Sequence, residues 1–229
     1  MLQDRLNHYL VNHPLLIIAF SLVLVVALGA GLPPQITTDF EEFFPDEDEN
    51  LVAYHHLQTT YTNVDNVYFA IAPKSGVVFD QDTLGIIAHM TEQAWQLPYS
   101  QRVDSLTNFP YTLANEDDFL VEDLFSSDAN LSQAQLQQRE QFALREPATV
   151  NALISAQGDV AGMRILIKLP GVDRALETPK VVFFVRDLLA RFEQDHPQFN
   201  TYLTGQIVVD QAFPESTAGD MAFVWPAFF

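Results

Sequence analysis

An uninterrupted apolar segment near the N-terminus constrains this chain more than any other feature. It runs from Leu15 to Leu32, LLIIAFSLVLVVALGAGL, and Ser21 is its only polar side chain. As a helix rising about 1.5 Å per residue it is about 27 Å long, close to the roughly 30 Å hydrocarbon core of a bilayer. Apolar residues cover all of its faces, so it needs lipid or other membrane helices around it. Because Pro14 suits a first helical turn and Pro33-Pro34 stop a helix, the sequence predicts a transmembrane helix over residues 15–32.

A cleaved signal peptide is the alternative interpretation, because Ala27-Leu28-Gly29 fits a small-x-small cleavage site. The apolar run exceeds the roughly 7 to 15 residues usual in a signal peptide, which favours a retained helix. In both cases the chain beyond residue 32 is exported. Arg5 is the only basic residue before the segment and none occurs from Leu6 through Pro73, which favours a cytoplasmic N-terminus. Residues 1–14 predict a short helix on the cytoplasmic or interfacial side.

Composition limits what the exported part can be. Hydrophobic residues make up 48% of the chain, which is normal for a soluble domain with one anchor. The net charge of −19, from 30 acidic and 11 basic residues, argues against nucleic acid or anionic lipid headgroups as partners held by charge. Without cysteine the chain has no disulfide, thiolate metal site or cysteine nucleophile. An exported bacterial domain of ordinary size, or two small ones, fits these limits.

An acidic and aromatic linker follows the apolar segment, over residues 33–65. One run of acids lies between Asp39 and Glu49 and another between Glu116 and Asp128, and we interpret both as solvated surface. Residues 51–62 of the linker predict a short helix. The side chains expected to face inward from it are Leu51, Tyr54 and Leu57 to Gln58.

The first of two strand-helix-strand patterns comes next. Asn66 to Ala72, NVYFAIA, is a nearly continuous apolar run typical of a central strand. Asp80 or Asp82 can cap the helix that follows, Pro98 ends that helix, and residues 103–107 predict a shorter strand. The helix carries one apolar stripe, made of Leu84, Ile87, Thr91 and Ala94 to Trp95.

The same order returns in the second half. Met163 to Leu169, MRILIKL, alternates apolar and basic side chains and predicts a half-buried strand. Thr178-Pro179 is a good N-cap and first-turn pair, and His196-Pro197 closes the helix. Asn200 to Thr204 predicts the last strand. The apolar stripe of this helix consists of Val181, Val185, Leu188 and Phe192.

Two such units in series predict an α+β fold. The simplest arrangement that buries both helical stripes is a split βαβ, ferredoxin-like sandwich over residues 66–205, with one antiparallel sheet and both helices on one face. Residues 113–157 form an insertion too long for a hairpin loop. Its helix-forming segment Leu131 to Leu144 predicts a mobile flap or a contact surface. Residues 206–229 end in an aromatic, apolar segment with Trp225, which we interpret as the lead-in to a second transmembrane helix.

Catalytic motifs are missing from the sequence. GxSxG, Walker A, GxGxxG and HExxH patterns do not occur, and the abundant carboxylates lie among polar neighbours where a solvated role is expected. His55 and His56 are adjacent and point about 100° apart on a helix, so they do not share a metal ion. The sequence predicts neither an enzyme nor a bound cofactor or metal.

Four segments carry a resemblance to a known family. They are TTDFEEFFPDEDE, LTNFP, LISAQGDVAGMRILIKL and YLTGQIVVDQAF, and with the apolar segment they cover nearly the whole chain. In their order along the chain and in their short motifs they resemble the N-terminal part of predicted exporters of the resistance-nodulation-division (RND) superfamily, the MMPL-like hydrophobe transporters. The resemblance implies a first transmembrane helix followed by a periplasmic porter domain of ferredoxin-like repeats. It also implies coupling to the proton gradient through ionisable residues of other helices, because Leu15 to Leu32 carries none.

The resemblance further implies a location and partners. The chain would sit in the bacterial inner membrane with its N-terminus cytoplasmic and its main domain periplasmic. Its partners would be the bilayer, a hydrophobic or lipid-like substrate, and the remaining helices and second porter domain of the transporter. Self-association into a homo-oligomer is compatible with it, and nucleic acid is not expected. A porter domain supplies a cleft, and the aromatic residues expected nearest to it are Phe40, Phe43, Phe44, Phe109 and Tyr111.

Two other functions remain open from the sequence. A singly anchored periplasmic module could bind or support a membrane complex without transporting anything. An exported enzyme would need a catalytic constellation that the sequence does not display.

Overall fold

The computed structural model describes the backbone of residues 14–30, 44–45, 47–61, 65–114, 119–126 and 131–228. The chain forms two units, Met1–Ile36 and Thr37–Phe229, each of which is described by itself. The predictions for residues 1–13 and for Phe40 and Phe43 lie outside the described residues.

The first unit is described over one helix, α2 (Pro14–Ala30). Its side chains from Pro14 to Val26 are exposed except for the half-buried Ile17. A helix is therefore confirmed for most of the predicted segment. Within the described parts of the chain, however, no helix has both the length and the apolar character needed to cross a membrane. The transmembrane prediction for residues 15–32 is not confirmed.

Helix α3 (Glu49–Tyr61) opens the second unit. The side chain of Asp48 accepts bonds from the backbone N–H groups of Asn50 (2.8 Å) and Leu51 (3.3 Å), which caps the first turn. The predicted helix is confirmed, but its predicted orientation is wrong, because Tyr54 and Leu57 are exposed. Because α3 is short and has apolar residues on more than one side, the sequence does not determine which side faces inward.

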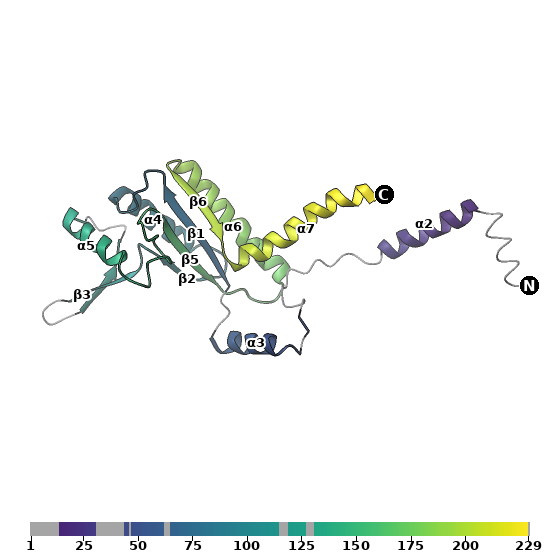
Figure 1. Ribbon diagram of the computed structural model, residues 1–229, viewed down its shortest axis with the longest axis horizontal. Helices are drawn as coiled ribbons and strands as arrows, with labels where there is room; N and C mark the ends of the chain where they lie inside the picture. The colour runs from purple at the N-terminus through teal and green to yellow at the C-terminus, as the bar shows by residue number, and fades with distance from the viewer. Residues whose placement is uncertain are drawn as a thin grey trace, which may run out of the picture. The chain divides into compact units, whose positions relative to one another are not determined.

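A four-stranded sheet forms the centre of this unit (Figure 1), and its strand order is β2-β5-β1-β6. Every neighbouring pair is antiparallel. In the register, Phe69 of the inner strand β1 lies opposite Met163 of β5 on one side and Leu203 of β6 on the other. The strands are β1 (Asn66–Pro73), β2 (Ser100–Ser105), β5 (Ala161–Ile167) and β6 (Phe199–Thr204).

Two crossover helices complete the two predicted strand-helix-strand segments. Helix α4 (Gln81–Ala94) joins β1 to β2, and α6 (Arg174–Asp195) joins β5 to β6. Because β1 and β2 both run antiparallel to β5, they are parallel to each other with β5 between them, and β5 and β6 flank β1 in the same way. The α+β class with an antiparallel sheet is thus confirmed.

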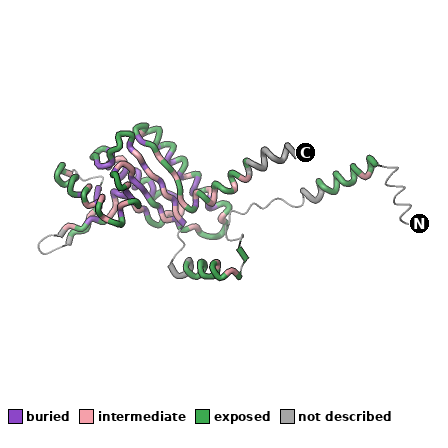
Figure 2. The backbone as a smooth tube through the Cα atoms, in the orientation of Figure 1, coloured by how far each residue is buried: buried purple, intermediate pink, exposed green. Residues whose placement is uncertain are grey.

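One apolar core lies between the sheet and these helices (Figure 2). Alternate residues of β1, from Val67 to Ile71, are buried, as the period of two in a strand requires. The apolar residues of the predicted stripes of α4 and α6 join the same cluster, except that Trp95 is exposed. Thr91 of the α4 stripe is buried and bonds with the hydroxyl groups of Ser105 and Thr107. Each fully buried Ile or Phe stabilises the folded state by roughly 1.5–3 kcal/mol. This shared core therefore holds the two strand-helix-strand segments together, with both helices on one face of the sheet.

The ends of α4 and α6 test the capping predictions. Asp80 caps α4, because its carboxylate accepts the N–H of Thr83 at 3.2 Å. The predicted start of α6 at Thr178-Pro179 is wrong, since the helix begins at Arg174 and Pro179 lies inside it. The buried carboxylate of Glu177 accepts hydrogen bonds from backbone N–H groups just before the helix. The helix therefore starts one turn earlier than predicted.

The insertion after β2 contains a hairpin and a helix. Strands β3 (Pro110–Ala114) and β4 (Phe119–Asp123) pair antiparallel, and α5 (Gln133–Ala143) follows. A capping box between Ser132 and Gln135 fixes the start of α5, which confirms a helix in the predicted segment. The hairpin was not predicted. It lies at the end of the sheet opposite to α7, as Figure 1 shows.

Helix α7 (Gln206–Phe228) leaves the sheet after β6. Gly205, at the joint, has φ +116°, and a Cβ there would lie 2.6 Å from the carbonyl oxygen of Asn66. Only glycine allows this close crossing without strain. Ile207 is buried in the core and seats the first turn of the helix. A helix is therefore present over nearly all of residues 206–229.

Candidate functional site

The structure brings two of the predicted aromatic residues together. Tyr111, on β3, is buried, and its ring meets the edge of Phe142 of α5 with centroids 4.9 Å apart. Phe109 is half-buried beside the same ring, with centroids 6.3 Å apart. The hydroxyl of Tyr111 also accepts a bond from Gln138 Nε2 at 3.2 Å. These contacts make Phe109 and Tyr111 part of the packing between the hairpin and α5.

A buried arginine fastens this aromatic cluster to the hairpin. The guanidinium of Arg139 on α5 donates to the carbonyl oxygens of Asp123 (3.0 Å) and Leu124 (2.7 Å) and pairs with the carboxylate of Glu122. Its Cζ also lies 5.1 Å from the centre of the Tyr111 ring. Through these hydrogen bonds and this ion pair, the guanidinium links α5 to the β3–β4 hairpin.

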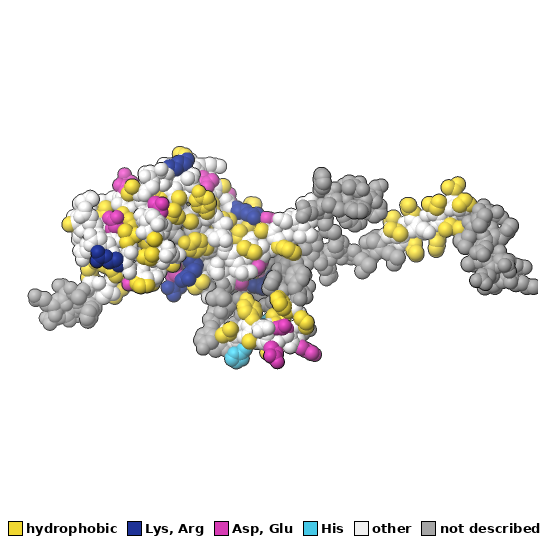
Figure 3. Space-filling model, in the orientation of Figure 1, with side chains coloured by type: hydrophobic (Ala, Val, Ile, Leu, Met, Phe, Trp, Pro, Cys, Tyr) yellow, Lys and Arg dark blue, Asp and Glu magenta, His cyan; other side chains and the backbone are white. Residues whose placement is uncertain are grey.

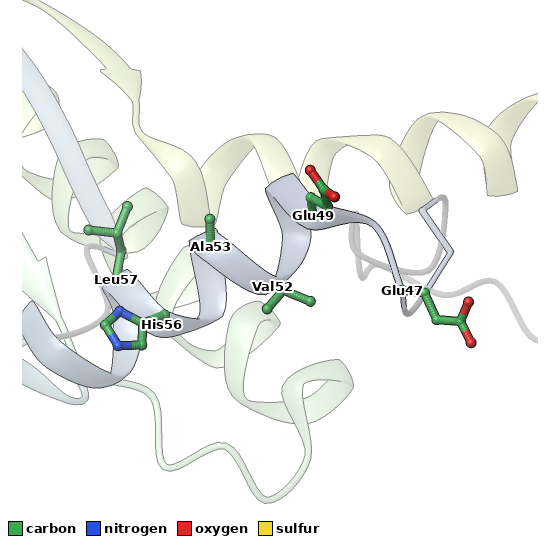
Figure 4. Close-up of a pocket in the computed structure, with 6 residues that line it drawn as sticks. All are labelled: Glu47, Glu49, Val52, Ala53, His56 and Leu57. Atoms are coloured by element: carbon green, nitrogen blue, oxygen red, sulfur yellow. The ribbon is translucent and has the colours of Figure 1, made fainter.

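Phe44 lies elsewhere, immediately before α3, and is exposed. The nearby helix carries a hollow of about 630 Å³ that is open to solvent. Figure 4 shows six side chains that line it, and Figure 3 shows hydrophobic, acidic and histidine side chains next to one another on α3. Its described lining residues are Glu47, Glu49, Val52, Ala53, His56 and Leu57.

The α3 hollow is open to solvent, and its described lining comes from one helix and the turn before it. Val52, Ala53 and Leu57 offer apolar surface, while the carboxylates of Glu47 and Glu49 add negative charge at the N-terminal end. A volume between roughly 300 and 1,000 Å³ is typical of small-molecule sites. Val52 and Ala53 were not predicted as site residues. The sequence signal for them was the number of apolar residues in this short helix, which is larger than one buried face can hold.

The face of the sheet opposite to the two crossover helices carries a polar row across three strands. Asp104 of β2 pairs with Arg164 of β5 at 2.9 Å, and Arg164 lies opposite Tyr68 of β1. Burial raises the pKa of the Tyr68 hydroxyl, an effect that the positive charge of Arg164 partly offsets. The protonated hydroxyl donates to the carbonyl oxygen of Ala152 at 2.9 Å. This row ties the end of the insertion to the sheet.

The comparisons with known proteins add no identity. No protein-family model matches this chain, and no curated protein matches it significantly. Across the residues that the structure describes, no three His, Asp or Glu side chains gather to hold a metal ion.

Proposed function

We propose that this chain supplies the first membrane helix and the periplasmic substrate-handling domain of a proton-driven RND-type exporter of lipids or other hydrophobic molecules. The observation that carries the proposal is the interleaving of two strand-helix-strand units in one antiparallel sheet. We assign this topology to the ferredoxin-like class. It agrees with the domain that the RND resemblance implies for residues 66–205.

The character of α2 supports a membrane location. Its described side chains from Leu15 onward are apolar apart from Ser21, and nearly all are exposed within its own unit. A helix without a polar face needs apolar surroundings. Because it carries no ionisable group, the proton-coupling residues belong to other helices of the proposed transporter.

The α3 hollow supports the handling of a hydrophobic substrate. It is open to solvent and brings three apolar side chains near two carboxylates, which suits a molecule with an apolar body and a polar end without negative charge. The aromatic cluster of Phe109, Tyr111 and Phe142 packs the hairpin against α5. In this proposal the α3 hollow receives substrate, and the insertion shapes the domain beside the sheet.

Membrane attachment is tested by alkaline carbonate extraction of the full chain expressed in bacteria. Wild type is expected to stay in the membrane pellet. Leu22→Arg places a charge in the middle of α2, which costs about 2.5–3.5 kcal/mol at the centre of a bilayer, and is expected to release the chain. Leu22→Ala is the matched control and should stay in the pellet. Release of the wild-type chain by carbonate would contradict the proposal.

Substrate handling is tested by photolabelling with a diazirine derivative of a long-chain alkylamine, whose ammonium group complements the two carboxylates, followed by mass spectrometry of the labelled peptides. Labelling is expected on α3 and should fall in Val52→Gln. Val121→Gln is the matched control, because Val52 and Val121 are 55% and 61% exposed. Equal labelling of α3 in both variants, or labelling confined to other elements, would argue against the α3 hollow as the substrate site.

A further inference from the structure

The turn that follows β2 contains LTNFP, one of the segments that carry the RND resemblance. The side-chain amide of Asn108 closes this turn. Its Oδ1 accepts the N–H of Ser105 at 2.8 Å, and its Nδ2 donates to the carbonyl oxygen of Val103 at 2.7 Å. Leu106, between these residues, is completely buried. The turn is therefore a fixed end of β2, from which the chain enters the insertion.

Three buried hydroxyl groups join the same turn to α4. Thr91 Oγ1 lies 2.9 Å from Ser105 Oγ and 3.0 Å from Thr107 Oγ1, and the last two oxygens are themselves 2.9 Å apart. Thr91 Oγ1 also lies 2.8 Å from the carbonyl oxygen of Ile87, one turn earlier in α4. Thr91, Ser105 and Thr107 are 5%, 0% and 3% exposed. Buried polar groups that satisfy one another fix their arrangement, because water does not replace a lost partner. We name Thr91, Ser105, Thr107 and Asn108 the polar cluster.

The β3–β4 hairpin starts and ends at this polar cluster. The carbonyl oxygen of Thr107 accepts the N–H of Phe125 at 3.0 Å, and that of Phe109 accepts the N–H of Leu124 at 2.8 Å. Leu124 and Phe125 are both buried. The segment that enters the hairpin and the segment that leaves it are thus held together at the turn that α4 contacts.

The far end of the insertion is fastened to the sheet. The hydroxyl of Tyr68 on β1 donates to the carbonyl oxygen of Ala152, and the N–H of Gly162 on β5 donates to that of Leu153, both at 2.9 Å. A segment that is bonded to α4 at one end and to two strands at the other has little freedom to swing as a whole.

We propose that the polar cluster couples the insertion to α4, so that the hairpin and α4 move as one rigid body in the folded protein. The coupling depends on Thr91, because its hydroxyl bonds with both Ser105 and Thr107. Helix α5 is carried along, since Arg139 links it to the hairpin. Of the two roles that the sequence leaves open for the insertion, this assigns the fixed contact surface and not the mobile flap. The inference does not rest on the proposed function.

Distances between spin labels test the coupling in the full chain, which has no native cysteine to replace. The labels are attached to Gln93→Cys on α4 and Val121→Cys on β4, because both positions are exposed. A narrow distance distribution is expected. Thr91→Val keeps the shape of the side chain but removes the hydroxyl, and it should broaden the distribution. A broad distribution before Thr91 is changed would overturn the proposal, because the insertion would then be a mobile flap.

Two further variants and a second label pair separate loss of coupling from loss of packing. Thr178→Val removes another buried threonine hydroxyl, since Thr178 and Thr91 are 3% and 5% exposed, and should leave the distribution narrow. Thr91→Ser keeps the hydroxyl and should also leave it narrow. Labels at Gln93→Cys and Gln194→Cys, both exposed, report the distance from α4 to α6, which should not change in any variant.

Three results of these distance measurements would overturn the role of the polar cluster. The first is an unchanged distribution in Thr91→Val. The second is equal broadening in Thr178→Val and Thr91→Val. The third is broadening of the α4–α6 distance as well, which would mean that the hydroxyl of Thr91 stabilises the whole domain and does not specifically couple the insertion to α4.

Hydrogen exchange measures the size of the effect at the base of the hairpin. The net contribution of one intramolecular hydrogen bond corresponds to roughly a two- to tenfold change in an equilibrium constant. The N–H groups of Leu124 and Phe125 should therefore exchange about two- to tenfold faster in Thr91→Val, while peptides from β5 keep their protection. Unchanged exchange of these two N–H groups would show that the base of the hairpin does not depend on Thr91, which also overturns the proposal.

Discussion

Arg186 of α6 and Glu215 of α7 form a two-pronged ion pair, with Nη1 2.9 Å from Oε1 and Nη2 2.9 Å from Oε2. Gln211 Nε2 also donates to Glu215 Oε1 at 3.0 Å. The buried Ile207 seats the first turn of α7, so the helix is held at two points that are about 12 Å apart along its axis. The first half of α7 is therefore expected to follow any movement of α6.

Glu215→Gln is expected to loosen α7 with little loss of global stability. The two side chains are 47% and 43% exposed, and exposed ion pairs contribute about 0.2–1 kcal/mol. Spin labels on α6 and α7 should report a broader distance distribution, while the urea midpoint changes only slightly. The charge-exchanged double variant Arg186→Glu with Glu215→Arg should restore the narrow distribution. An unchanged distribution in Glu215→Gln would show that Ile207 alone positions α7.

Glu177 predicts an acid dependence of stability. Burial alone would raise the pKa of its carboxyl, but the N–H groups of Gly171, Asp173 and Val172 and the charge of Arg174 together lower it below the ordinary value of 4.5. The unfolded chain then binds the proton more readily, so this stabilisation is present above about pH 4.5 and is lost as the pH falls through the lower folded pKa.

Urea unfolding at pH values between about 5 and 3 measures this effect. The free energy of unfolding of the wild type should fall more steeply with decreasing pH than that of Glu177→Gln. Asp195→Asn removes an exposed negative charge at the other end of α6 and controls for net charge. If Glu177→Gln keeps the wild-type slope, the carboxylate of Glu177 does not cap the helix in solution.

Strands β1 and β5 could be predicted because their patterns reflect the same core that the structure shows. Val67, Phe69 and Ile71 face the helices, and the alternation of Met163 and Ile165 with Arg164 places the charge on the open face. The period of a strand encodes its buried face directly. The two strand-helix-strand segments and the α+β class could be predicted from these local patterns.

The hairpin and the start of α6 needed long-range information. Strands β3 and β4 expose Leu120 and Val121 and gain their order from each other and from Arg139 of α5. The start of α6 is set by Glu177 and by the ion pair of Arg174 with Asp65 at 2.9 Å, 109 residues away. Aromatic position alone also cannot distinguish a packed Tyr111 from one that lines a cleft.

Gly162→Ala is expected to destabilise the fold through steric overlap. A Cβ at this position would lie 2.0 Å from the Tyr68 hydroxyl oxygen and 2.7 Å from the carbonyl oxygen of Ala152. Overpacking of this kind costs about 1–3 kcal/mol. Gly85→Ala is the matched control, because no atom lies within 4 Å of its Cβ and the residue is inside α4. That variant should gain about 0.5–1 kcal/mol from helix propensity.

Urea titration of both glycine variants gives the two changes in unfolding free energy. Opposite signs are expected. Equal stability of Gly162→Ala and wild type would contradict the close approach of the Tyr68 ring to this position.

Arg139→Met is expected to release the insertion while the sheet stays folded. The variant keeps much of the side-chain length but leaves the carbonyl oxygens of Asp123 and Leu124 and the carboxylate of Glu122 without their donor. The Arg139 side chain is buried but that of Glu122 is 36% exposed, so the cost is expected to lie below the roughly 3–5 kcal/mol of a fully buried ion pair. Part of this loss should appear as local opening, because the hydrogen bonds and the ion pair of Arg139 described above all go to the hairpin.

Hydrogen exchange measured by mass spectrometry distinguishes local from global effects in this variant. Peptides from β3, β4 and α5 should exchange much faster in Arg139→Met, while peptides from β1 and β5 keep their protection. Arg145→Met removes an exposed arginine just after α5 and should leave both regions unchanged. Faster exchange throughout the domain would show that the insertion is part of one cooperative unit with the sheet. In that case the aromatic cluster of Phe109, Tyr111 and Phe142 would stabilise the whole domain and could not act as the base of an independent flap.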